Sequence, residues 1–445
     1  MTTNNNNFQH SDNIDDFALN FPLALPLQGI EGQELGDKVS RGKFLIILGD
    51  GMADEPIASL GNKTPLQVAN TPNIDRLTAM GRCGMLDTIP EGFHPGSEIA
   101  NLSVLGYDVS RVFEGRGTLE AASMGVEIGE DEMAMRCNLI CVKDGKIKNH
   151  SAGHISNEEA GELILFLQKE LGNEIVSFHP GVSYRHLLKI KNGLKQLECT
   201  PPHDVPEQDF RPLMIKPKTD EAKETADFLN DLILKSMKLL ENHPVNMIRA
   251  AAGKDKANSI WPWSPGYKPS MEHLLPQYGL KNGSVISAVD LIKGIGVYAG
   301  LKNIDVEGAT GLYDTNYEGK AQAAINALRK DDFVYLHIEA SDEAGHEGDV
   351  DLKIKTIEYL DSRVVKPVLE ELLTRDGPVT IALLPDHPTP CSIRTHTSEP
   401  IPFVIYKTGN EADDVEKYDE FSCKNGSYGL LKGREFIDEF FSSKH

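Results

Sequence analysis

Three short apolar runs constrain the fold of this chain most strongly. They are KFLIIL (43–48), FVYLHI (333–338) and VTIALLP (379–385), and each is rich in β-branched or long aliphatic residues. Continuous apolar runs of this length predict strands that are buried on both faces, as in a parallel sheet. The segment after the first run, TPNIDRLTAMG (71–81), predicts a helix that Thr71 caps. Strand followed by helix is the repeating unit of an α/β fold, so we predict an α/β fold with a central, mostly parallel sheet.

The chain is long enough to need more than one core. A chain of 445 residues exceeds the size at which a single core stops growing. From about 130 to 284 the patterns predict strands at 133–142 and 184–190 and amphipathic helices at 157–171 and 219–242. We therefore predict three parts, which are an extension (1–40) that is disordered or loosely docked, one domain made of 41–129 and 285–445, and an inserted α+β domain (130–284).

Each of the three apolar runs ends close to a carboxylate. Asp50 follows the first run, Asp342 follows the second and Asp386 follows the third, with His387 beside it. Open α/β sheets hold their ligands at the carboxyl ends of the strands. We therefore expect these side chains to lie together at one edge of the sheet.

Asp342 and His346 stand four residues apart in EASDEAGHEGD (339–349). On a helix this spacing places both side chains on one face, where a carboxylate and an imidazole can bind a divalent metal ion. A solvated surface pair is the alternative that the local sequence leaves open. His396, just before the run PFVIY (402–406), adds a third imidazole to the candidate set.

Ser97 follows Pro-Gly in FHPGSEIANLSVLGYD (93–108) and precedes a helical pattern. A serine at this position can present its hydroxyl beside free backbone N–H groups, or it can simply cap the helix. Three carboxylates, three imidazoles and this hydroxyl fit two divalent ions in a shared cleft. The predicted chemistry is in-line attack of Ser97 on phosphorus, which gives a phosphoserine.

Charge and composition exclude several kinds of partner. The formal net charge of −22 argues against nucleic acid or an anionic membrane as partner, because both need a basic face. The six cysteines are scattered without CxxC spacing, which is typical of reduced thiols in a cytosolic protein. The chain has no apolar run of about eighteen residues and no basic N-terminal region ahead of an apolar stretch. We therefore expect a cytoplasmic protein, and the attack on phosphorus predicted for Ser97 implies a small phosphorylated metabolite, which a local cluster of cations or metal ions in this acidic surface would have to receive.

Five motifs together resemble one known family. GDGMAD, HPGSEIANLSVLGYD, EASDEAGHEGD, LLPDHPTP and RTHTSEPIPF are similar to the motifs of archaeal-type, 2,3-bisphosphoglycerate-independent phosphoglycerate mutases, which belong to the alkaline phosphatase superfamily. The resemblance runs from about residue 43 to the C-terminus. It implies an alkaline-phosphatase-like metal domain with a substrate domain inserted into it.

The resemblance also implies how the metal ligands divide. One ion would be held by Asp342, His346 and His396, and the other by Asp50, Ser97, Asp386 and His387. The ions would be Mn, Zn, Mg or Co, without 2,3-bisphosphoglycerate. The implied reaction interconverts 2- and 3-phosphoglycerate, with Ser97 taking the phosphoryl group from one hydroxyl of glycerate and returning it to the other.

The phosphate and carboxylate of such a substrate call for cations and for an acid–base group. Candidates in the inserted domain are His154, Arg185, His203 and Asp204, each of which can also be a structural or surface group. Lys320 in the returning domain is a candidate to neutralise the transferring phosphoryl group, or is a solvated lysine. His337, inside a predicted strand, is interpreted as a core histidine or as a residue behind the ligands rather than as a metal ligand itself.

Three positions depart from the family pattern on the substrate side. His154 stands where arginine is expected, Glu98 where aspartate is frequent, and IWPWSPG (260–266) where a Trp-Leu-Trp-Gly type of segment is expected. These departures leave open an ATP-dependent homoserine kinase, a proposed branch of the same family, as an alternative function. A phosphomonoesterase, with water as the acceptor, is a further alternative. ATP is expected as a co-substrate only for the kinase.

Overall fold

The computed structural model describes residues 42–442. The predicted extension at 1–40 lies outside the described residues. An eight-stranded sheet has the strand order β11-β10-β12-β1-β13-β14-β2-β15. In that order its strands are Lys302–Asn303, Gly283–Ile286, Phe333–Ile338, Lys43–Gly49, Val379–Leu384, Ile401–Lys407, Arg82–Asp87 and Gly429–Lys432. Only the pairings of β14 with β13 and β2 are antiparallel, so the prediction of an α/β fold with a mostly parallel sheet is confirmed.

Alternate residues of β1 contribute side chains to two separate hydrophobic cores. Ile46 and Leu48 belong to one hydrophobic cluster, and Leu45 and Ile47 belong to another. Successive side chains of a strand point to opposite faces of a sheet, so the two clusters are the two faces of this one. All four residues are almost completely buried. The continuous apolar run at 43–48 is thus explained by burial on both faces.

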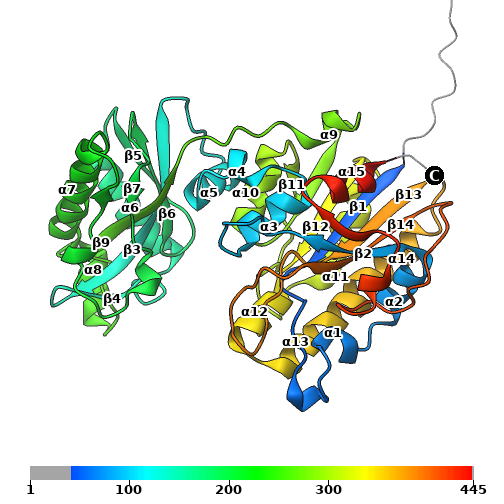
Figure 1. Cartoon of the computed structure of the whole chain (residues 1–445). Coiled ribbons are helices and arrows are strands. Elements are labelled where there is room, and N and C mark those ends of the chain that lie inside the picture. Colours follow the sequence, from blue (N-terminus) through cyan, green and yellow to red (C-terminus); the bar gives the residue numbers. More distant parts are fainter. Residues whose placement is uncertain (1–41, 443–445) are drawn as a thin grey trace, which may run out of the picture. The chain divides into compact units, whose positions relative to one another are not determined.

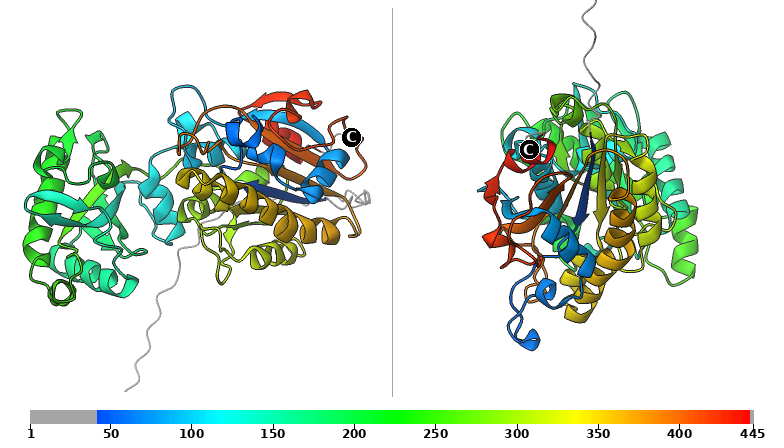
Figure 2. Two further views of the ribbon diagram at one scale, coloured as in Figure 1. Left: turned by 90° about the horizontal axis from the view of Figure 1, so that it is seen from below. Right: turned by 90° about the vertical axis from the view of Figure 1, so that its right-hand side faces the viewer.

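Helices cover both faces of the eight-stranded sheet (Figures 1 and 2). The cluster containing Ile46 takes side chains from α3 (Ser97–Val104), α10 (Asp290–Tyr298) and α15 (Glu435–Phe441). The cluster containing Ile47 takes side chains from helices of the opposite face, which are α2 (Pro72–Met80), α11 (Tyr317–Ala327), α13 (Val350–Tyr359) and α14 (Lys366–Leu372). A six-residue π-helical segment, Leu360–Val365, joins α13 to α14.

Helix α2 has the predicted bounds but a different cap. It begins at Pro72 and Gly81 ends it, as predicted, yet the side chain of Thr71 makes no capping hydrogen bond. The carboxylate Oδ1 of Asp361, in the π-helical segment, accepts from the backbone N–H groups of Asn73 and Ile74 instead, at 2.8 and 2.7 Å. A residue far away in the sequence therefore satisfies the free donors of this helix end.

A second, antiparallel sheet is built from residues between 132 and 266. Its strands are β3 (Glu132–Lys143), β4 (Lys146–Asn149), β5 (Val176–His179), β6 (Arg185–Lys191) and β9 (Ser259–Gly266). Helices α6 (Asn157–Leu171), α7 (Lys223–Leu240) and α8 (Pro244–Ala251) close its core, which includes residues of all three. The predicted helices at 157–171 and 219–242 correspond to α6 and α7. The division of the chain into domains stays a prediction.

The segment IWPWSPG forms most of strand β9. Among the described residues β9 pairs only with β3, so it is an edge strand, where proline can be tolerated because one side makes no ladder hydrogen bonds. Pro262 pairs with Cys137, and Trp261 and Trp263 are buried on either side of it.

The remaining elements are short. The helices are α1 (Pro65–Val68), α4 (Val109–Val112), α5 (Arg116–Ser123), α9 (Leu274–Gln277) and α12 (Ala340–Glu347), and a two-stranded sheet joins β7 (Leu197–Glu198) to β8 (Lys216–Pro217). Within residues 42–442 no helix combines the length and the apolar character needed to cross a membrane.

Candidate metal centre

The carboxyl ends of β1, β12 and β13 bring the predicted acidic residues together. β1 lies between β12 and β13 and is parallel to both. Asp50 directly follows β1, Asp342 lies in the first turn of α12 after β12, and Asp386 follows β13. Gly51 has a positive φ of 61°, and a Cβ there would lie 2.6 Å from Asp342 Oδ1. Only glycine therefore allows the backbone to pass this close to the Asp342 carboxylate.

Asp342, His346 and His396 form the first candidate ligand group. The two oxygens of Asp342 lie 3.2 Å from His346 Nε2 and 3.4 Å from His396 Nε2. The two Nε2 atoms are 2.9 Å apart. Three donor atoms from one helix and one distant loop thus converge on a single point, as the spacing of Asp342 and His346 predicts.

Asp50, Asp342 and His387 form a second group, which Ser97 adjoins. His387 Nε2 is 3.8 Å from Asp50 Oδ1 and 3.2 Å from Ser97 Oγ. Ser97 is the first residue of α3, and Gly96 rather than Ser97 occupies the capping position. The Ser97 hydroxyl contacts His387 instead of the helix end. Ser97 is half-buried, whereas His387 is completely buried.

Asp386 is held by three donors. Its Oδ1 accepts from the backbone N–H of Gly51 at 3.2 Å and from the backbone N–H of the next residue, His387, at 2.9 Å. Its Oδ2 accepts from Asn101 Nδ2 at 2.9 Å. Thr389 holds the first group in a similar way, because its hydroxyl donates to Asp342 Oδ1 at 2.5 Å. Outer contacts of this kind fix the orientation of metal ligands. Sequence reasoning missed Asn101 and Thr389, since neither has a local pattern.

A chain of buried polar residues lies behind Asp50. His337, on β12, has its Nε2 3.2 Å from Asp50 Oδ2 and its Nδ1 3.1 Å from Glu339 Oε1. Glu339 in turn pairs with the fully buried Lys320 of α11. Burial alone would raise the pKa of Glu339, but the Lys320 ammonium and the His337 ring hold that pKa well below its usual range. Lys320, predicted as a neutralising cation, is thus placed against Glu339.

The donor set fits divalent cations. Burial, followed by the carboxylates of Asp386 and Asp342, raises the pKa of Asp50 well above its ordinary value, so the ionised form of Asp50 is disfavoured here unless a cation is bound. Among residues 42–442, Asp50 Oδ1 and His337 Nε2 are also buried without a hydrogen-bond partner. A cation would offset the repulsion and satisfy such atoms, and mixed carboxylate and imidazole donors suit a divalent ion.

Arg136, which sequence reasoning missed, lies near two of the predicted substrate-side residues, His203 and Arg185. Arg136 lies in the middle of β3, and its guanidinium stands 5.0 Å over the Trp263 ring. The exposed His203 ring packs edge-on against the same tryptophan at 5.4 Å, with Nε2 3.5 Å from Asp204 Oδ1. Arg185 is the first residue of β6, and its guanidinium is 5.8 Å from the Tyr184 ring.

Arg136 is 8% exposed, its NH1 contacts Glu120 at 3.2 Å, and its Nε has no partner in the described chain. Burial lowers its pKa, and the Arg116 and Arg185 cations add to this effect. Arg136 could have been predicted from the sequence, because it is a charged residue in the middle of the apolar run at 133–142. His154 is exposed on a turn with a positive φ of 52°.

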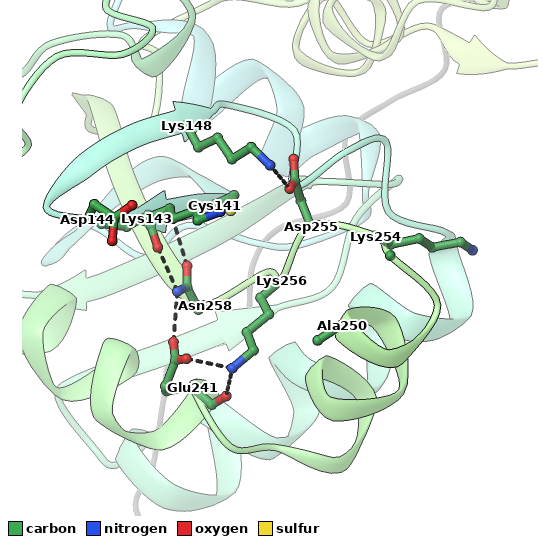
Figure 3. Close-up of a pocket in the computed structure, with 12 residues that line it drawn as sticks. Cys141, Lys143, Asp144, Lys148, Glu241, Ala250, Lys254, Asp255, Lys256 and Asn258 are labelled. Atoms are coloured by element: carbon green, nitrogen blue, oxygen red, sulfur yellow. Dashed lines mark hydrogen bonds and ion pairs between the residues drawn. The ribbon is translucent and has the colours of Figure 1, made fainter.

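A cavity of about 530 Å³ lies elsewhere, between β3 and α8, and contains none of the predicted site residues. Most of its charges pair with one another (Figure 3). Lys148 pairs with Asp255, and Lys256 pairs with Glu241, which also accepts from Asn258 at 2.9 Å. These pairs are sufficient to explain the cavity's polar lining as structural.

The protein has a mostly parallel sheet with helices on both faces, and carboxylates and imidazoles lie at the strand ends. These features define an α/β protein with a candidate two-metal centre. The family described as 2,3-bisphosphoglycerate-independent phosphoglycerate mutase matches residues 78–246. The protein of that name from Methanosarcina mazei is 52% identical over 397 residues, which cover 89% of this chain and 98% of the relative. The chain therefore belongs to the 2,3-bisphosphoglycerate-independent phosphoglycerate mutase family, and the resemblance seen in its motifs is confirmed.

Two solved structures share the fold. A protein from Pyrococcus horikoshii matches with a TM-score of 0.77 at 30% identity, over 91% of this chain and 99% of that one. The cofactor-independent phosphoglycerate mutase from Thermoplasma acidophilum matches with a TM-score of 0.63 at 26% identity, over 90% of this chain and 98% of that one.

Proposed function

We propose that this protein interconverts 2-phosphoglycerate and 3-phosphoglycerate through a phosphoserine on Ser97. The observation that carries the proposal is the 3.2 Å contact between Ser97 Oγ and His387 Nε2, inside a cluster of buried carboxylates and imidazoles. The names of the relatives at about half identity support this choice of substrate.

The ligands divide as the family resemblance implies. Asp342, His346 and His396 would hold one ion, and the other would be held by Asp50, Ser97, Asp386 and His387. Such ions, which we propose to be Mn²⁺, Zn²⁺, Mg²⁺ or Co²⁺, supply positive charge for the phosphoryl group and lower the pKa of the serine hydroxyl.

The protein's own residues orient the nucleophile. Thr389 Oγ1 lies 3.3 Å from His387 Nδ1 while it donates to Asp342, so one hydroxyl links residues assigned to both ions. Asn101 donates to the backbone carbonyl of Ser97 at 2.8 Å and also to Asp386. The helix that carries Ser97 is thereby tied to the strand end that carries Asp386, which keeps the reacting oxygen among the ligands.

The substrate's second anionic group needs its own partner. We propose that Arg136 and Arg185 bind the carboxylate of phosphoglycerate, since a guanidinium grips a carboxylate with two parallel hydrogen bonds. The unpartnered Nε of the buried Arg136 supports this assignment. We further propose that Asp204, paired with His203, moves the proton between the two hydroxyls of glycerate.

Phosphorus NMR on manganese-loaded protein tests the function. One sample receives 3-phosphoglycerate alone, and the expected result is the appearance of 2-phosphoglycerate. A second sample receives ATP and homoserine, where phosphohomoserine without isomerisation in the first sample would favour the kinase alternative and overturn the proposal. Inorganic phosphate as the main product of the first sample would instead indicate a phosphomonoesterase.

A further inference from the structure

One buried histidine beside the proposed ligands has no assigned role. His337 is completely buried, and its Nε2 lies 3.2 Å from Asp50 Oδ2 without forming a hydrogen bond to it. Asp50 Oδ1 is likewise buried and without a partner in the part of the chain that the structure describes. Polar atoms left unpaired in a protein interior are costly, so the unpaired atoms on these two neighbouring side chains indicate that a third group belongs beside them.

The other ring nitrogen of His337 is already committed. Nδ1 lies 3.1 Å from Glu339 Oε1, an oxygen that also accepts from Ser287 Oγ and from the backbone N–H of Ala288, both at 2.9 Å. The second oxygen of Glu339 accepts from the Lys320 ammonium. An ionised carboxylate in this position takes the proton of Nδ1 as a hydrogen-bond donor. In the neutral ring Nε2 then carries a lone pair, as in a metal-bound histidine oriented by a carboxylate.

His186 shows how a structural buried histidine differs. It too is almost completely buried with an unpartnered Nε2, but its Nδ1 accepts from the backbone N–H of Gly181 at 3.0 Å. The neutral ring then carries its proton on Nε2 and cannot offer a lone pair there. His337 and His186 therefore have opposite tautomers, and only His337 points a free lone pair toward carboxylates.

We propose that His337 is an additional ligand of the ion bound by Asp50 and Asp386, with Glu339 and Lys320 as its positioning residues. The donor atoms of Asp50, His337 and Asp386 lie within 4.8 Å of one another. The inference rests on the proposed two-metal site and adds one ligand to it. Lys320 then acts on the centre through Glu339 and His337.

The direct test counts the histidine nitrogens bound to metal in the full chain. Protein labelled with ¹⁵N-histidine is loaded with Mn²⁺, its metal content is measured by mass spectrometry, and bound nitrogens are counted by electron–nuclear double resonance. The wild type should show nitrogens from four histidines, namely His337, His346, His387 and His396. His337→Gln should show one fewer, and the matched control His186→Gln should show the wild-type number.

A second variant tests the positioning role. Glu339→Gln keeps the imidazole but removes the carboxylate that orients it, so Mn²⁺ should bind about 10- to 100-fold more weakly at one site with an unchanged nitrogen count at saturation. Unchanged affinity in Glu339→Gln would overturn the positioning role of Glu339 and Lys320.

The outcomes separate this inference from the proposed function. Two bound ions with isomerase activity but only three histidine nitrogens in the wild type would overturn the His337 ligand alone. A folded protein that binds no Mn²⁺ would overturn both. Because the count is made on the wild type, it decides the question even if His337→Gln does not fold.

Discussion

The hydroxyl oxygen of Ser97 lies 3.2 Å from Nε2 of His387, although the two residues are 290 positions apart in the chain. A second hydroxyl, that of Thr389, also lies in this cluster, but it is completely buried and already donates to Asp342. Ser97 is half-buried and is the first residue of α3, whose capping position is occupied by Gly96. The structure thus distinguishes the hydroxyl that can react from the one that orients ligands.

Replacing this nucleophile should abolish catalysis without unfolding the protein. Ser97→Ala removes one oxygen from a site held by six other predicted ligands, so the isomerisation rate should fall roughly 10³-fold or more. Phosphorus NMR with 3-phosphoglycerate measures the rate, and circular dichroism checks the fold. Ser103→Ala is the matched control, because it removes a buried hydroxyl without a described partner from the same helix. If Ser97→Ala keeps most of the activity, the phosphoserine mechanism is wrong.

Metal removal should destabilise the protein as well as inactivate it. Asp50 and its neighbouring carboxylates repel one another when no cation is present, so a cation that binds only the folded state stabilises it. With free Mn²⁺ at 100 times its Kd, the gain is about 2.7 kcal/mol per site. Thermal unfolding with Mn²⁺ and after chelation measures it. The Mn²⁺-dependent increase in melting temperature should be smaller for Asp342→Asn. A wild-type melting temperature that does not change with Mn²⁺ would contradict the two-metal site.

Arg136→Met should weaken substrate binding more than it affects folding. A charge-assisted hydrogen bond to a carboxylate is worth about 1.5–3 kcal/mol, which corresponds to a rise in KM of roughly 10- to 150-fold. Steady-state kinetics with 3-phosphoglycerate measures the change. The control is Arg211→Met, because Arg211 also stacks on an aromatic ring at 5.0 Å but is exposed. Equal KM values for the two variants would exclude Arg136 as a substrate ligand.

The strand ends could be predicted from the sequence because their signal is local. An apolar run followed by Asp50 or Asp386 reports both the buried strand and the position of the carboxylate. Contacts between elements that are far apart in the sequence leave no such local signal. The capping of α2 by Asp361 and the pairing of Glu339 with Lys320 are of this kind. His337 was interpreted as core or supporting, because an apolar run shows that a residue is buried but not what its ring faces.

A buried ion pair next to the centre should be important for stability. Lys353 Nζ lies 2.8 Å from Asp54 Oδ2, and both side chains are completely buried. Lys353→Met leaves the carboxylate buried without its partner, which should lower the free energy of unfolding by about 3–5 kcal/mol. Urea unfolding measures it. Lys223→Met is the control, since the solvent-exposed pair of Lys223 with Asp227 should contribute little to stability. A loss for Lys353→Met no larger than the loss for Lys223→Met would contradict the prediction.

Glu420 should make the protein less stable as the pH rises through the slightly acidic range. Burial raises the pKa of this carboxyl from 4.5 to about 7, against the hydrogen bonds that it accepts from Thr64 at 2.7 Å and from the Asp54 N–H at 3.0 Å. The charges nearby are those of Asp419 and of the Asp54–Lys353 pair. Between these two pKa values the folded state holds a proton that the unfolded state has lost, so the free energy of unfolding falls as the pH rises and levels off above about 7.

Glu420→Gln isolates this effect, because the amide cannot ionise and still offers an oxygen to the Asp54 N–H. A shift of this size corresponds to at most about 3 kcal/mol, since one pKa unit is worth about 1.4 kcal/mol. The stability of Glu420→Gln relative to the wild type should therefore increase by up to that amount between pH 5 and pH 8. Urea unfolding of both proteins across this range measures the difference, and two parallel pH profiles would show that the buried Glu420 carboxyl does not titrate there.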